Sequence, residues 1–383
     1  MKVHAISIKD LSEDFLNRLA LFLEEGFPSD SAKLWQFRFN YWWRSNPYAV
    51  DDDVVGWILT DDEINPPIRG FMGNIPILYQ YGIEKHLGCS STSWYIPEDL
   101  RGPEGSSMYL WFTRQKDKDI FINTTPSHGV PTILESLGFK KIADKPLFNY
   151  MIIINVAKYI SMMATLLNHF SKSQSGKKAQ IFVLASKIGH ACSKIIPKTK
   201  HAQMPAYDTD GRFTIQLCEH SQSFLEYLTE HKKGNTIEFS KDKTTLDWIL
   251  FSPEVQALLH RTTAQIFTNT GEYCGYFIYD IQHVGKDTTL RIRELQLLKP
   301  EDAVIKLILK HVKIEAKNAG CAAVYSGLQN PDPAVDKLLH KHILLSLKTD
   351  NRYYVKFRKN VITDVDPYSI YVPSDLDPDV GFI

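Results

Sequence analysis

The stretch Ser93–Leu110, SWYIPEDLRGPEGSSMYL, has the pattern of a strand end, a turn of small residues and the start of a helix. Such a turn leaves backbone N–H groups unpaired at the positive end of the helix dipole, where anions bind. We expect the donors to be the amides of residues 105–107, with Arg101 adding a charge-assisted hydrogen bond. Glu104 stands in the same turn and would repel an anion if its carboxylate points inward. The stretch therefore predicts a phosphate-binding turn that carries one acid.

The composition describes a folded protein without an overall charge. A length of 383 residues favours two domains of about 150 residues each. Lys plus Arg equals Asp plus Glu at 44 each, so no global field favours nucleic acid as a partner. Five cysteines without paired spacing predict reduced thiols, with neither a disulfide framework nor a metal site. No signal segment and no bilayer-length apolar run are visible, so we expect a cytoplasmic protein.

The first half of the sequence alternates strand and helix signals. We expect strands at 2–8, 54–62, 68–82, 87–96, 119–125 and 148–156, and helices at 12–27, 106–117 and 131–139. The same order begins again at Arg212, and two weak echoes support a duplication: LWQFRFNYWWRSNP against LDWILFSP, and IRGFMGNIPI against YCGYFIYDI. The sequence thus predicts an α/β (α+β) fold in two copies, each with a mixed, mostly antiparallel central sheet flanked by helices.

A basic connector separates the copies. Residues 156–202 contain eight lysines and no Asp or Glu, with two apolar stretches on either side of a polar hinge. Such a pair of helices could lie on an anionic membrane surface or bind an anionic substrate. It could equally be a helical linker whose lysines are solvated. We therefore expect domains at 1–156 and 206–383, and a basic amphipathic helical linker at 157–205 with a possible peripheral membrane contact.

The motifs around the opening stretch resemble those of the GNAT superfamily of acyl-CoA-dependent N-acyltransferases. PEDLRGPEGSSMYL is followed at the right distance by the buried strand DIFINTT and by ILESLGF. The similarity covers Met1–Val156 through motifs and Arg212–Asn360 only through the order of elements. The resemblance implies that the turn binds the pyrophosphate of acyl-CoA, with contacts from Ile96, Arg101, Gly102, Gly105, Ser106, Ser107, Asn123 and Ser127. It also implies acetyl-CoA or another acyl-CoA as co-substrate, and no metal.

Three positions depart from the family pattern. Glu104 stands where the signature has its first glycine, and Leu134 stands where the family commonly has a tyrosine that protonates the departing thiolate. Ser127 replaces a common asparagine but can still cap a helix. In the second copy, the strand LRIRELQLL runs through KPEDA into a helix, with two acids and no glycine. The resemblance therefore implies that the first copy binds the cofactor and that the second has lost the anion site.

The candidate catalytic residues are His128, Tyr95 and Ser93. A loop histidine can take a proton from an ammonium group, although such residues are more often merely solvated. Ser93 and Tyr95, together with Ser91, could hold a water that acts as the base. Cys89 could be a nucleophile, but a buried structural thiol is the expected alternative.

The aromatic run Trp35–Trp43 could either stack on sugar rings or form core packing. With the resemblance, these residues predict an acyl-CoA-dependent N-acyltransferase, and specifically an N-acetyltransferase. The expected acceptor is an amine, an amino sugar of surface polysaccharide synthesis, because the tandem order resembles GNAT-like proteins of bacterial polysaccharide biosynthesis. The alternatives are a Fem-type aminoacyl-tRNA-dependent transferase and a catalytically degenerate GNAT-fold binding or scaffold protein.

Overall fold

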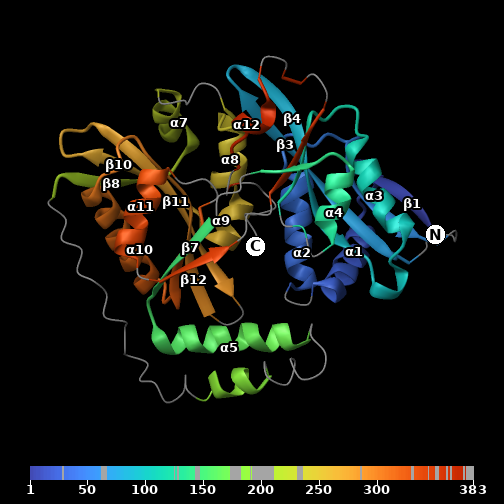
Figure 1. The fold of residues 1–383 in the computed structure, drawn as a ribbon, viewed down its shortest axis with the longest axis horizontal. Helices are drawn as coiled ribbons and strands as arrows, with labels where there is room; N and C mark the ends of the chain where they lie inside the picture. The colour runs from blue at the N-terminus through green and yellow to red at the C-terminus, as the bar shows by residue number, and fades with distance from the viewer. Residues whose placement is uncertain are drawn as a thin grey trace. The chain divides into compact units, whose positions relative to one another are not determined.

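A computed structural model describes most of the chain: residues 1–27, 30–61, 67–124, 126, 129–142, 147–172, 183–189, 191, 211–230, 236–284, 287–328, 332–343, 345–349, 353–358, 361–362, 365–373 and 376. The chain forms two compact units (Figure 1). The first comprises Met1–Lys145, Leu228–Glu254 and Asn351–Ile383, and the second comprises Pro146–Tyr227 and Val255–Asp350. This division differs from the predicted ranges 1–156, 157–205 and 206–383, because each unit contains segments from both halves of the sequence. Among the described residues, no helix is long and apolar enough to cross a membrane.

The first unit is built on an eight-stranded mixed sheet. Seven strands follow the order β1-β2-β3-β4-β5-β15-β6, and β9 pairs with the end of β3. Their bounds are β1 Lys2–Ser7, β2 Val54–Thr60, β3 Gly70–Tyr81, β4 Glu84–Tyr95, β5 Ile120–Asn123, β6 Lys140–Lys141, β9 Ile237–Phe239 and β15 Tyr354–Phe357. Every pair is antiparallel except β4–β5. The strand order predicted from the sequence agrees with this sheet as far as β5, whereas β6 was not predicted.

Helices cover both faces of this sheet. They are η1 Ile8–Asp10, α1 Glu13–Gly26, α2 Ala32–Phe39, η2 Asn40–Arg44, η3 Glu98–Leu100, α3 Pro103–Thr113, α4 Val130–Ser136, α8 Lys243–Phe251 and α12 Pro367–Ile370. Ser12 caps α1 as expected, because its side chain accepts a hydrogen bond from the Phe15 amide at 3.2 Å. Met108 of α3 and Leu134 of α4 share a buried cluster with Cys89 and Phe121 of the sheet. α3 and α4 therefore pack on the same face as these strand residues.

The aromatic run belongs to the core and does not form a sugar-stacking surface. It continues from α2 into the π-helical turn η2, and Trp35, Trp42 and Trp43 are each no more than 2% exposed. The Trp43 ring stacks on Phe39, with centroids 4.9 Å apart, and its Nε1 donates to the carbonyl oxygen of Asn74 at 3.0 Å. Rings buried this way contribute hydrophobic stabilisation and cannot reach a sugar.

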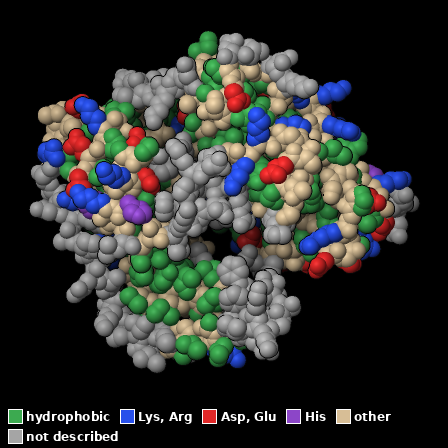
Figure 2. All heavy atoms as spheres, viewed as in Figure 1, with side chains coloured by type: hydrophobic (Ala, Val, Ile, Leu, Met, Phe, Trp, Pro, Cys, Tyr) green, Lys and Arg blue, Asp and Glu red, His purple; other side chains and the backbone are tan. Residues whose placement is uncertain are grey.

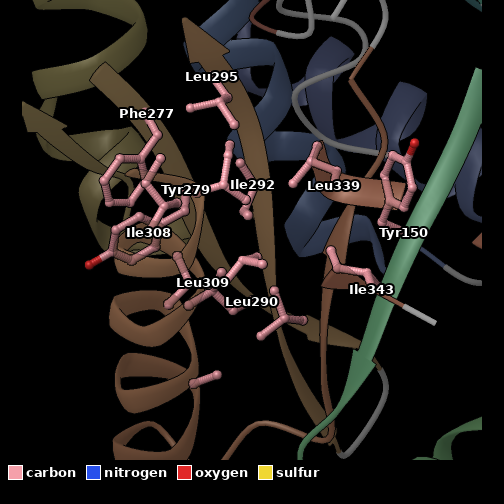
Figure 3. Close-up of a cluster of buried hydrophobic side chains, with 14 of the residues drawn as sticks. Tyr150, Phe277, Tyr279, Leu290, Ile292, Leu295, Ile308, Leu309, Leu339 and Ile343 are labelled. Carbon is pink, nitrogen blue, oxygen red and sulfur yellow. The ribbon is translucent and has the colours of Figure 1, made fainter. Parts of the chain in front are cut away.

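The second unit repeats the first in strand order. Its seven strands run β14-β7-β13-β12-β11-β10-β8, with bounds β7 Leu147–Ile153, β8 Phe213–Cys218, β10 Thr262–Thr268, β11 Tyr273–Val284, β12 Asp287–Leu297, β13 Ala323–Ser326 and β14 Leu345–Thr349. Its helices are α5 Val156–Lys172, α7 Ser221–Glu230, α9 Pro253–Leu259, α10 Asp302–Asn318 and α11 Pro333–His342; α7 and α9 extend past the unit's ends. Leu309 of α10 and Leu339 of α11 point towards the sheet, against Leu290 and Ile292 of β12 (Figure 3). The predicted fold class, with two mixed sheets flanked by helices, is confirmed.

The two copies exchange their closing strands. Taken from its other edge, the strand order of the second sheet is β8-β10-β11-β12-β13-β7-β14. In this order β7 is the sixth strand, the place that β15 has in the first sheet. β7 pairs with β13 through Val324–Ile152, whereas β15 pairs with β5 through Val355–Ile122. The sequence predicted a strand at 148–156 and, in RYYVKFRKN at 352–360, another in the second copy, but it placed each in the sheet of its own half. Each sheet is thus completed by a strand that the other half of the sequence supplies.

Candidate functional site

The two parallel strands of the first unit, β4 and β5, are paired only as far as Ser90 and Ile122. The ladder between β4 and β5 consists of the pairs Gly88–Ile120, Cys89–Phe121 and Ser90–Ile122. β4 nevertheless continues to Tyr95, so its last residues have no partner in β5. Such a gap exposes backbone groups at the carboxyl ends of parallel strands, where ligands commonly bind in mixed sheets.

A β-bulge lies in β4 just beyond this gap. Thr92 pairs with Gly73 and Tyr95 pairs with Phe71, so two residues of β4, Ser93 and Trp94, lie opposite a single residue of β3. Ser93 adopts a left-handed backbone conformation with φ of 54°, which non-glycine residues rarely adopt. A bulge turns backbone groups out of the ladder, and such strained positions gather at functional sites. The predicted residue Ser93 therefore has an unusual backbone conformation at a bulge, which the sequence did not indicate.

A buried polar network fills the same gap. Asn123 Nδ2 donates to Ser91 Oγ at 2.8 Å and to Tyr109 Oη at 3.0 Å. Asn123 is 6% exposed, and its Oδ1 has no hydrogen-bond partner among the described residues. An unsatisfied buried carbonyl oxygen is costly in an empty site and suits a ligand that brings an N–H group. The structure thus places the predicted residue Asn123 at the gap and adds Tyr109, which the sequence analysis missed because α3 presents it among apolar residues.

The predicted phosphate-binding turn is tighter than expected. Helix α3 already begins at Pro103, with Gly102 as its extended N-cap, so residues 105–107 are helical. The Ser106 amide donates to the Gly102 carbonyl at 3.3 Å, and the Ser107 hydroxyl donates to the Glu104 carbonyl at 2.6 Å. The first amides of a helix have no partner in the helix, and proline has no N–H. The amides of Gly102, Glu104 and Gly105 are therefore the donors that this turn offers to an anion.

Close packing explains one of the glycines of this turn. A Cβ atom on Gly105 would lie 2.1 Å from Cδ1 of the buried residue Ile96. Gly105 itself is buried, so a glycine here lets the start of α3 approach the end of β4. The predicted contact residue Ile96 therefore acts by setting the position of the turn.

The acid of the turn lies over its N-cap. Glu104 is exposed, and its Oε2 lies 3.1 Å from the position of a Cβ on Gly102. Its carboxylate is thus folded back towards the turn. Arg101 is exposed as well, and its Nε donates to the Ile96 carbonyl at 3.3 Å. The turn therefore presents an arginine and an opposing acid to any anion.

The predicted catalytic residues are not brought together by the described structure. A Cβ on Gly26 would meet the Tyr95 ring at 2.4 Å, and that ring lies 5.1 Å from Phe22, whereas Trp94 packs on Tyr109 of α3. Tyr95 thus faces α1, away from the network of Asn123. Partial burial raises the pKa of Tyr95. Ser127 and His128 lie outside the described residues.

Cys89 and metal chemistry receive no support from the described geometry. Cys89 is fully buried, and burial raises the pKa of its thiol, which opposes a role as nucleophile. The described cysteines 89, 218, 274 and 321 are free thiols. Across the described part of the chain, no group of three or more His, Cys, Asp or Glu residues could hold a metal ion.

The second copy has changed the chemistry of the equivalent positions. Its β12 also carries a bulge after the parallel ladder ends at Ile292, and the extra residue is Arg293. Arg293 Nε lies 2.8 Å from Asp280 Oδ2, and Arg261 Nε lies 2.7 Å from Asp280 Oδ1, with all three side chains at most 2% exposed. The bulge that holds Ser93 and Trp94 in the first copy thus holds a residue of a buried ion cluster in the second.

A pocket lies at the end of β12 in this second copy, next to the start of α10. Its volume is about 390 Å³, and its charged lining consists of Arg212, Lys299, Glu272 and Glu301. Glu301 is the N-cap of α10 and Asp302 its first residue. Two acids at the helix N-terminus oppose the binding of a pyrophosphate, as the sequence predicted for this copy.

Comparison with known proteins identifies the fold. No protein-family model and no curated protein matches the sequence. Three solved structures match most of the chain. A probable N-acyltransferase from Enterococcus faecalis V583 is 10% identical, and the match covers 93% of this chain and 73% of that one with a TM-score of 0.51. Saccharomyces cerevisiae N-myristoyltransferase with bound myristoyl-CoA and inhibitors is 12% identical, and the match covers 92% of this chain and 80% of that one with a TM-score of 0.54. A GCN5-related N-acetyltransferase from Anabaena variabilis is 9% identical, and the match covers 93% of this chain and 73% of that one with a TM-score of 0.51. The chain thus shares its fold with these GNAT-type acyltransferases.

Proposed function

We propose that the protein is an acyl-CoA-dependent N-acyltransferase whose first unit binds the acyl-CoA. The observation that carries this proposal is the arrangement at the carboxyl end of β4, where a strand gap, a bulge at Ser93 and the start of α3 follow one another. The yeast N-myristoyltransferase of similar fold has myristoyl-CoA bound, which supports the class of co-substrate. The second copy lacks this combination, because its bulge residue is a buried arginine.

The residues of the gap have distinct roles in this proposal. The amides of Gly102, Glu104 and Gly105 bind the pyrophosphate, and Arg101 adds a positive charge. Backbone N–H groups of the β4 bulge polarise the thioester carbonyl as negative charge develops on its oxygen. The buried Oδ1 of Asn123 accepts a hydrogen bond from an N–H group of the bound acyl-CoA.

The transfer needs one proton acceptor and one proton donor. The acceptor amine attacks the thioester carbonyl, a C–N bond forms and the C–S bond breaks. The amine loses its proton to His128 or to a water, and the thiolate takes up a proton as it leaves. We assign the second proton to Tyr109, because its Oη accepts a hydrogen bond from Asn123 at 3.0 Å and a phenol that accepts can also donate a proton. Leu134, buried beside it, offers no proton.

We further propose acetyl as the acyl group and an amino sugar of surface polysaccharide synthesis as the acceptor. Both choices are supported by the resemblance of the sequence alone. The rings of Trp35, Trp42 and Trp43 do not add support for a sugar, because they are buried. A panel of amines, in which amino sugars are compared with amino acids and polyamines, tests this choice by the release of free CoA thiol.

Calorimetric titration with acetyl-CoA tests the first step of the proposal. We expect saturable binding, weakened by Arg101→Ala and retained in Arg114→Ala, which removes an equal charge from the other end of α3. If the protein binds no acyl-CoA of any chain length, the proposal fails.

A binding or scaffold role is the second candidate, and one observation favours it. The Glu104 carboxylate lies where an anion would approach Gly102, which is unusual for a phosphate-binding turn. Binding of acyl-CoA without turnover of any amine in the panel would support this role. Turnover of one amine would exclude it.

A further inference from the structure

The connector between the copies contributes two helices to the second unit. Helix α5 is fixed to this unit through its buried residues Ala157, Met162 and Ala164, and Lys158 Nζ donates to the Gly320 carbonyl at 2.6 Å. The next helical residues, 183–189, pack on α5 at a point of close approach. A Cβ on Gly189 would lie 2.9 Å from Cβ of Ala164. Small residues therefore form the contact between the two helices.

The second of these helices turns its large apolar side chains outward. Leu184 is 60% exposed and Ile188 is 55% exposed. Residues four apart share a helix face, and Ala191, three residues further on, is exposed as well. A helix at a protein surface normally buries its large aliphatic side chains and presents polar ones. In this helix the large aliphatic side chains of Leu184 and Ile188 are exposed instead. These exposed side chains indicate an apolar binding partner.

The apolar surface extends over α5. Figure 2 shows hydrophobic side chains gathered where Figure 1 places this helix. The described α5 residues Tyr159, Ile160, Met163, Leu166 and Leu167 are partly exposed. Apolar side chains gathered on one element mark an interaction site more often than single exposed side chains do.

The charge of the connector indicates the chemistry of the partner. Residues 156–202 contain eight lysines, no arginine and no acid. Lys187 of the same helix is exposed as well, at the flank of the face that carries Leu184 and Ile188. Exposed aliphatic side chains with lysines among them are characteristic of helices that lie in the interface of an anionic bilayer, because the lysines contact headgroups while the aliphatic side chains enter the acyl region.

We propose that α5 together with residues 183–189 and 191 forms a docking surface for anionic phospholipid bilayers. The surface lies in the second unit, whereas the proposed acyl-CoA site lies in the first, so the two proposals stand separately. Leu184 and Ile188 insert into the headgroup boundary, and Lys187 binds the anionic headgroups.

Vesicle co-sedimentation tests this surface with the full chain. The probes are vesicles of phosphatidylcholine alone and vesicles that also contain phosphatidylglycerol. We expect binding to the anionic vesicles only, weakened by added salt. Leu184→Glu combined with Ile188→Glu is expected to lower the partition coefficient about tenfold or more, because two apolar insertions are replaced by two anions. Leu217→Glu is the matched control, since Leu217 of β8 is 57% exposed in the same unit, and it should bind like the unaltered protein.

Several outcomes would overturn the proposal. They are absent binding to anionic vesicles, equal binding to both vesicle types, and unchanged binding by the double variant. A concentration-dependent dimer in light scattering that the double variant abolishes would instead assign the surface to a second copy of the chain. Leu184→Ser with Ile188→Ser provides a milder pair if circular dichroism shows that the glutamates disturb the fold. Calorimetry with acetyl-CoA on the same variants shows whether the first unit is intact.

Discussion

Replacing Glu104 by glutamine tests whether the carboxylate of Glu104 weakens the binding of an anion at the turn before α3. The side chain is exposed, and its Oε2 lies 3.1 Å from the position of a Cβ on Gly102, the N-cap of α3. A pyrophosphate that binds the free amides of this turn approaches the same carboxylate. Two like charges about 4 Å apart repel each other by about 1 kcal/mol in water. Glu104→Gln keeps the shape of the side chain and removes the charge, so we expect acetyl-CoA to bind about fivefold more tightly.

The assay is calorimetric titration with acetyl-CoA at low and at high ionic strength. The gain should shrink at high salt, because mobile ions screen an exposed pair of charges. Asp52→Asn is the matched control: it removes one charge from a side chain that is 83% exposed. Asp52 lies away from the turn, near the opposite end of α3. Its neighbour Asp53 accepts a hydrogen bond from Lys118, which follows the C-terminal end of this helix. That helix has 11 residues and is about 16 Å long, so the control should leave the affinity unchanged.

Two results would refute this reasoning. Unchanged or weaker binding by Glu104→Gln would show that the carboxylate does not face the ligand, or that the ligand does not use this turn. An equal gain in Asp52→Asn would show that the effect reflects net charge and not the position of Glu104.

Three further perturbations address catalysis and stability. Tyr109→Phe is expected to lower kcat by about 100-fold or more while acetyl-CoA binding changes little, because the phenol supplies a proton only as the thiolate leaves; an unchanged kcat contradicts the role. Asp280→Asn should lower the free energy of unfolding by about 3–5 kcal/mol, since two buried guanidinium groups lose the carboxylate that they share; chemical denaturation with a change under about 1 kcal/mol would oppose this. Burial alone would raise the pKa of Asp242, but hydrogen bonds from Lys85 and Thr245 outweigh it and lower the pKa to about 2. This carboxylate therefore stabilises the fold above its ordinary pKa of 3.8, and the stabilisation is lost as the pH falls towards 2. Asp242→Asn should flatten the loss of stability over that range in acid titrations, and an unaltered acid transition would contradict it.

The sequence predicted the elements well because their signals are local. Alternating apolar residues, caps and turns lie within a few positions of one another, so β2, β3, β4 and α3 were predicted close to their observed bounds. The exchange of β7 and β15 was not predictable in this way. Both are short apolar strands. β15 lies between β5 and β6, and β7 lies at the equivalent place between β13 and β14. The residues of either strand would suit either place, so they do not specify which sheet the strand completes. That choice depends on the path of the whole chain.

The site was predicted in its chemistry more than in its geometry. Arg101, Gly102 and Gly105 were predicted because a turn of small residues before a helix leaves amides free for an anion, and their role in binding stays a prediction. The left-handed conformation of Ser93 gave no signal, since serine is not a residue that favours it. Tyr109 was missed because a helix residue that contacts a strand gap has the same apolar spacing as any core residue. The run Trp35–Trp43 was ambiguous because burial depends on the tertiary packing of the helix.

The two copies show how one bulge can serve different ends. Each sheet has a bulge in its fourth strand, beyond the end of the parallel ladder, where backbone groups leave the hydrogen-bonded pattern. In the first copy the bulge residues Ser93 and Trp94 lie beside a network with an unsatisfied amide oxygen. In the second copy the bulge residue Arg293 forms a buried ion pair with Asp280, which fixes the strand. A bulge that binds substrate must keep its polar groups unsatisfied, whereas one that stabilises the fold must satisfy them. Both demands cannot be met at one position, which explains why only the first copy is expected to bind acyl-CoA.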